Sequence, residues 1–86
     1  MPAISRFFGI IIKMYFNDHN PPHFHAEYGE HEAVYAIETL ELLRGKLPSR
    51  AHAMVIEWAT MHRPELRANW ESAREMQTVT NIEPLE

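Results

Sequence analysis

The spacing of apolar residues in this 86-residue chain changes once, near residue 47, and no other feature constrains the fold as strongly. Before that point apolar residues alternate with polar ones or form short blocks, which is typical of β-strands. After it they recur three and four residues apart, as along one face of an α-helix. We therefore expect one α+β domain over residues 1–86, with a small antiparallel sheet of three to four strands followed by two helices packed on one face.

Turn residues divide the first half of the chain into strands. Gly29-Glu30 lies between two alternating runs, and its glycine-first order is what a two-residue type II′ hairpin turn requires. A loop over residues 17–22 contains two prolines and two asparagines, which end the strand before it. The predicted strands cover residues 6–16, 23–28, 31–38 and 40–43. The first of them is apolar on both faces, so we expect it to be well covered.

Helical signals organise the second half of the chain. One helix is expected from residue 48 or 49 to about His62. A second helix has Pro64 in its first turn, where the missing N–H costs nothing. Ile82 and Leu85 in the C-terminal tail either cover a sheet edge or belong to a frayed terminus.

Composition excludes several classes of protein. The chain has no cysteine, which excludes disulfides, thiolate zinc sites and cysteine nucleophiles. Its net charge of −4 argues against duplex DNA, because binding to DNA depends on a cationic surface. No apolar stretch approaches the ~18 residues of a membrane span, and Lys13 ends the N-terminal apolar run too early for a signal peptide. We therefore expect a cytoplasmic protein with no membrane partner.

One short basic cluster interrupts this acidic chain. It comprises Arg44, Lys46 and Arg50. Such a cluster either holds a phosphate or an acidic partner, or forms a solvated turn without a ligand.

Residues 18–31 carry four of the six histidines in the run D-H-N-P-P-H-F-H-A-E-Y-G-E-H. Histidine titrates near neutral pH, binds metals and transfers protons, so this density indicates a chemical site. With Gly29-Glu30 as the turn, residues 23–28 pair with residues 31–36, and side chains alternate between the two faces. One face then carries His23, His25, Glu27, Glu32 and Glu38. The other is the core face, with Phe24, Ala26, Tyr28, Ala33, Tyr35 and Ile37. His31 shares the core face and is expected to be structural.

The predicted pairing places Glu27 directly opposite Glu32. Like charges in this position destabilise a strand pair unless something neutralises them. A metal ion, a protonated His25 or Lys13 on the first strand would do so.

Three interpretations of the histidine face stay open. The first is a site for a divalent metal such as zinc or manganese, with the ligands His23, His25, Glu27 and Glu32. In the second, His19, His23 and His25 act as general acid and base, and Asp18 orients one of the rings. In the third, the histidines form a hydrogen-bonded polar face without chemistry.

The histidine run and residues on both sides of it resemble a bacterial family catalogued as domain of unknown function 4160. The resemblance is strongest over residues 16–26, F-N-D-H-N-P-P-H-F-H-A. It covers nearly the whole chain, through residues 4–10, Gly29, residues 45–48, Trp58-Ala59, His62, Glu65-Leu66, Asn69-Trp70 and residues 82–85.

This resemblance implies a small stand-alone protein that is often encoded beside another small protein. Such proteins are suspected of being the toxin-like member of a toxin–antitoxin-type pair. The site residues that the resemblance implies are Asp18, His19, His23 and His25, with His62 and Asn69 second. We therefore expect action on RNA through the histidine cluster, with a neighbouring-gene protein as partner. The alternatives are a divalent-metal-binding protein and a non-enzymatic protein-binding module.

Overall fold

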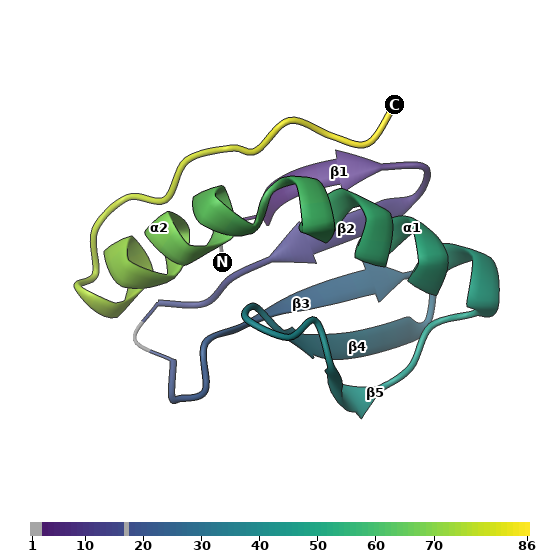
Figure 1. Ribbon diagram of the computed structural model, residues 1–86, viewed down its shortest axis with the longest axis horizontal. Helices are drawn as coiled ribbons and strands as arrows, with labels where there is room; N and C mark the ends of the chain where they lie inside the picture. Colours follow the sequence, from purple (N-terminus) through teal and green to yellow (C-terminus); the bar gives the residue numbers. More distant parts are fainter. Residues whose placement is uncertain (1–2, 17) are drawn as a thin grey trace.

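The computed structural model describes residues 3–16 and 18–86, and it shows an antiparallel sheet followed by two helices (Figure 1). Asn17, in the predicted loop, lies outside the described residues. The strands follow chain order across the sheet and are β1 (Ala3–Phe7), β2 (Ile10–Lys13), β3 (His23–Tyr28), β4 (His31–Ala36) and β5 (Leu42–Gly45). The helices are α1 (Ser49–Met61) and α2 (Arg63–Arg74), which lie on the same face of the sheet. Within this part of the chain, no helix combines the length and the hydropathy that a membrane span needs.

The predicted α+β class is confirmed, but the sheet has five strands rather than three to four. The difference arises because the strand predicted at residues 6–16 is a hairpin, β1 and β2, in which Phe7 pairs with Ile10. Its two turn residues, Phe8 and Gly9, have φ values of 49° and 82°. A type I′ turn requires positive φ at both positions, and phenylalanine rarely adopts it. Because Phe8 is apolar, the sequence pattern predicts a strand at this position and not a turn. In the structure the Phe8 side chain is 60% exposed.

The β3–β4 hairpin forms as predicted. Tyr28 pairs with His31 across the two-residue turn, and Gly29 has a φ of 59°, which its lack of a side chain permits. The next turn differs from the prediction, because β4 ends at Ala36 and Leu40 lies outside the strands with a φ of 61°. Leu40 donates its N–H to the Ala36 carbonyl at 2.9 Å. The last strand is therefore shifted by two residues toward the C-terminus.

The hydrophobic core lies between the sheet and the helices. Phe24 and Tyr35 stack across β3 and β4, and Trp58 of α1 packs edge-on against Phe24, with ring centroids 6.0 Å apart. Each large apolar side chain buried in this way contributes about 1.5–3 kcal/mol. The buried members of the predicted core face are Phe24, Ala26, Ala33, Tyr35 and Ile37. Tyr28 and His31 are exposed instead, because they flank the hairpin turn at the end of the sheet.

The C-terminal tail covers the β1 edge of the sheet. Ile82 donates its N–H to the Ile4 carbonyl at 2.7 Å, and both Ile82 and Leu85 are buried. The side chain of Asn69 in α2 holds the tail, since it donates to the Thr80 carbonyl at 2.8 Å and accepts the Thr80 N–H at 2.9 Å. The tail is thus a packed cover for an outer strand rather than a frayed terminus.

Replacement of Asn69 by Ala should lower the free energy of unfolding by about 1–3 kcal/mol, because it leaves the polar groups of Thr80 without partners. Urea denaturation measures this loss, and limited proteolysis should show faster cleavage in the tail. Asn81→Ala is the matched control, because Asn81 is exposed in the same segment. Equal stability of the two variants would contradict the role assigned to Asn69.

Candidate metal centre

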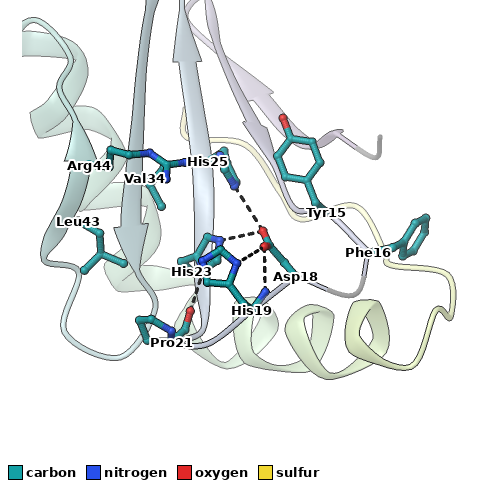
Figure 2. Close-up of a pocket in the computed structure, with 10 residues that line it drawn as sticks. All are labelled: Tyr15, Phe16, Asp18, His19, Pro21, His23, His25, Val34, Leu43 and Arg44. Atoms are coloured by element: carbon teal, nitrogen blue, oxygen red, sulfur yellow. Dashed lines mark hydrogen bonds and ion pairs between the residues drawn. The ribbon is translucent and has the colours of Figure 1, made fainter.

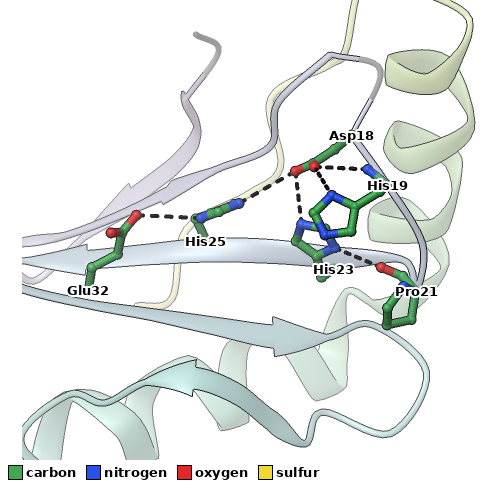
Figure 3. A network of polar contacts seen from close by, with 6 residues as sticks. All are labelled: Asp18, His19, Pro21, His23, His25 and Glu32. Carbon is green, nitrogen blue, oxygen red and sulfur yellow. Dashed lines mark hydrogen bonds and ion pairs between the residues drawn. The ribbon is translucent and has the colours of Figure 1, made fainter.

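Two histidines and one aspartate converge at the start of β3. His23 and His25 occupy alternate positions of this strand, so their side chains leave the same face of the sheet. The loop before the strand brings Asp18 between them (Figures 2 and 3). Its Oδ2 atom lies 2.9 Å from His23 Nε2 and 3.7 Å from His25 Nε2. One ligand atom from each of the three residues lies within 4.8 Å of the other two.

The two separations from Asp18 Oδ2 are close to those between neighbouring ligand atoms around a single ion. With metal–ligand bonds of about 2.0–2.1 Å, neighbouring ligands in tetrahedral or octahedral geometry lie about 3–3.5 Å apart. The two distances from Asp18 Oδ2 fall on either side of this range. An ion at this point would require Asp18 Oδ2 to lie farther from His23 Nε2 and closer to His25 Nε2 than it does here.

The other ring nitrogen of His23 is fixed by the loop. His23 Nδ1 lies 2.7 Å from the Pro21 carbonyl, which only accepts, so Nδ1 carries a hydrogen and donates. A metal-bound histidine usually donates its second ring N–H to a carbonyl or a carboxylate in this way, which leaves Nε2 for the ion.

His25 is the least satisfied polar side chain of the site. It is only 7% exposed, and neither ring nitrogen has a hydrogen-bond partner among the described residues. The nearest groups are Glu32, 3.4 Å from Nδ1, and Asp18, 3.7 Å from Nε2. Burial and the neighbouring His23 lower the pKa of His25 more than these two carboxylates raise it. A buried, neutral imidazole with a free lone pair is the form that a metal binds.

Asp18 supplies the negative charge of the site. Burial raises the pKa of this carboxyl group, but the backbone amide of His19 and the ring of His23 together hold it below the ordinary value. The His19 amide donates to Asp18 Oδ1 at 2.9 Å. Asp18 is therefore ionised at neutral pH and available as a ligand.

The two opposed glutamates contact different side chains. Glu27 pairs with Glu32 in the strand register, as predicted. Lys13 of β2 lies 3.1 Å from Glu27, while Glu32 faces His25. In the predicted metal set, Glu27 and Glu32 accompany the two histidines, whereas in the structure the carboxylate that converges with them is that of Asp18. Strand alternation cannot show this, because the loop folds back onto the strand.

The remaining histidines lie at the edge of the site or away from it. His19 is exposed at its mouth, with Nδ1 3.0 Å from Asp18 Oδ1. His62 pairs with Glu65 at the junction of the helices. His52 Nδ1 lies 2.8 Å from the buried Tyr35 hydroxyl.

The three converging residues lie in the wall of a pocket of about 400 Å³ (Figure 2). Its lining is Tyr15, Phe16, Asp18, His19, Pro21, His23, His25, Val34, Leu43 and Arg44. The sequence did not point to Tyr15, whose ring packs edge-on against His25 at a centroid distance of 4.5 Å. The sequence indicated Arg44 only as a member of a basic cluster and did not place it relative to the histidines.

Comparison with known proteins identifies a family but no activity. The family model described as "Domain of unknown function (DUF4160)" matches residues 9–71, which include the whole site. Neither the curated proteins nor the solved structures include a match to the chain. Residue roles therefore follow from the geometry alone.

The lowered pKa of His25 predicts a loss of stability in mild acid. Its unfolded form takes up a proton near the ordinary value of 6.5, and its folded form only at lower pH. The contribution of His25 to the free energy of unfolding is therefore complete above pH 6.5. It is lost as the pH falls through the pKa of His25 in the folded state. Urea denaturation at pH 7.5 and 5.5, with a chelator present, should show a smaller loss for His25→Gln than for the wild type.

His31→Gln is the control for this experiment, because His31 is exposed and outside the site. It should lose as much stability as the wild type between the two pH values. An equal loss in His25→Gln would show that His25 does not contribute to the acid sensitivity.

Proposed function

We propose that this chain, which belongs to the DUF4160 family of domains of unknown function, binds one divalent transition-metal ion through Asp18, His23 and His25. The observation that carries the proposal is the convergence of these three donors, with a carbonyl placed on the far nitrogen of His23. His25 adds independent support, because its buried ring nitrogens have no hydrogen-bond partner in the described part of the chain. An ion would satisfy His25 Nε2 and would separate His23 Nε2 from the carboxylate.

The donor set narrows the choice of metal. Two imidazoles and one carboxylate, without thiolates, suit zinc, manganese or iron(II). Structural zinc sites are normally closed by four protein ligands, whereas catalytic sites have three and keep positions open for water or substrate. Here the three donors border a pocket, which supports a site of the open type.

Metal-assisted hydrolysis is the reaction class that this arrangement supports best. A divalent ion in such a site lowers the pKa of bound water to about 7 and polarises the bond to be cleaved. Asp18, His23 and His25 would hold the ion. His19 is exposed beside Asp18 and is positioned to exchange a proton between the site and solvent.

A second proposal is metal-free acid–base cleavage of RNA. In this proposal the chain is the toxin-like member of a two-protein module, and a neighbouring-gene protein is its partner. The observation in its favour is the contact of the Asp18 carboxylate with His19 and His23 at 3.0 and 2.9 Å, since a carboxylate can orient a catalytic imidazole. It ranks second because His23 is engaged at both ring nitrogens and His25 is buried.

Metal binding can be measured on protein purified without a polyhistidine tag. We expect one zinc or manganese ion per chain. At a free concentration 100-fold above Kd, the ion would stabilise the fold by about 2.7 kcal/mol. For a domain of this size the corresponding rise in Tm is roughly 10–20 °C. His25→Gln and Asp18→Asn should abolish the rise.

His31→Gln should keep both the bound ion and the thermal shift, because His31 lies outside the site. Absence of metal binding by the wild type would refute the proposed function. An unchanged shift in both His25→Gln and Asp18→Asn would place the ion elsewhere.

Incubation with RNA, with and without EDTA, separates the two proposals. The metal proposal predicts that cleavage requires added metal and is lost in EDTA and in His25→Gln. The metal-free proposal predicts cleavage that resists EDTA and is lost in His19→Ala, because His19 alone of the three histidines has an exposed ring. EDTA-resistant cleavage would exclude a catalytic role for the ion.

A further inference from the structure

Arg44 lies in the same cross-strand row as the metal centre. His25 of β3 pairs with Val34 of β4, and Val34 pairs with Arg44 of β5. Side chains of directly paired residues leave the same face of a sheet. Strand spacing of about 4.8 Å puts the backbone of Arg44 roughly 10 Å from that of His25. Figure 2 shows Arg44 and His25 along the wall of one pocket.

An irregularity in β5 points two successive side chains toward this pocket. Val34 pairs with Arg44, but the next residue, Tyr35, pairs with Leu42, so Leu43 is an extra residue in the strand. In a regular strand, successive side chains lie on opposite faces, whereas a bulge redirects one of them. Leu43 and Arg44 accordingly both line the pocket.

Arg44 also differs in its charge balance from Lys13, the other cation in this cross-strand row. Lys13, on the opposite side of His25 in the same row, is paired with Glu27 at 3.1 Å. Arg44 has no ion pair within residues 3–16 and 18–86. With a divalent ion bound, Asp18 and Glu32 would offset the charge of the ion, so Arg44 would leave the pocket with an uncompensated positive charge.

We infer that the pocket binds a phosphate ester, whose phosphate group bridges the metal ion and the Arg44 guanidinium. This inference rests on the proposed metal centre and names the class of its substrate. A guanidinium binds phosphate through two parallel N–H donors. A phosphate monoester has a third unesterified oxygen that can reach the ion at the same time. A carboxylate held by both of its oxygens on Arg44 has none left for the ion.

Inorganic phosphate is the probe for this inference, and cobalt(II) is the metal, because its visible spectrum reports changes in coordination. Phosphate should change the spectrum of the cobalt-loaded wild type. Arg44→Gln should weaken phosphate binding about 10- to 100-fold, as expected for loss of a charge-assisted hydrogen-bonding group, with cobalt affinity unchanged. Arg50→Gln is the matched control, because Arg50 is exposed in α1 and does not line this pocket. It should bind phosphate as the wild type does at the same ionic strength.

The possible failures are distinguishable. If the wild type does not bind cobalt, both the metal centre and the phosphate site are refuted. If cobalt binds but phosphate affinity is equal in Arg44→Gln and the wild type, the phosphate site is refuted and the metal centre stands. If acetate binds as tightly as phosphate and with the same dependence on Arg44, the ligand class is a carboxylate, and the assignment to phosphate esters is wrong.

Discussion

The contact of Asp18 with His23 and His25 is the interaction on which the site depends. It places a carboxylate from a loop against two imidazoles that are almost fully buried on one strand. Burial of polar groups is unfavourable unless they are paired. Pro21 and Asp18 satisfy His23, but neither ring nitrogen of His25 has a hydrogen bond within the described part of the chain. A bound cation would give His25 a partner. Without the cation, the fold would bear the free-energy cost of burying the unpaired His25 ring.

The rest of the fold provides a rigid support for this contact. The helices cover one face of the sheet, and the tail covers its β1 edge, so the strand that carries both histidines is central and fixed by core packing. Trp70 of α2 extends this support to the site, because its ring centroid lies 5.1 Å from that of His23. Catalytic groups held by packed strands are positioned more accurately than groups held by loops alone.

The sequence predicted the features that depend on local pattern. The register of the β3–β4 hairpin, and with it the shared face of His23 and His25, followed from one glycine and from strand alternation. The turn at Phe8 was missed because phenylalanine is an unusual turn residue. The approach of Asp18 to the histidines depends on the path of a loop, which alternation and propensity do not determine. The position of Arg44 depends on an extra residue in β5, for which the sequence carries no signal.

Anomalous diffraction from crystals soaked with zinc or manganese would locate the proposed ion. We predict one strong peak between the three donors, about 2.0–2.2 Å from an Asp18 oxygen and from one ring nitrogen each of His23 and His25. The absence of a peak at this position, or a fully occupied peak coordinated by other residues, would refute the proposed metal centre. In that case the three side chains would be a hydrogen-bonded element of the fold and not a metal centre.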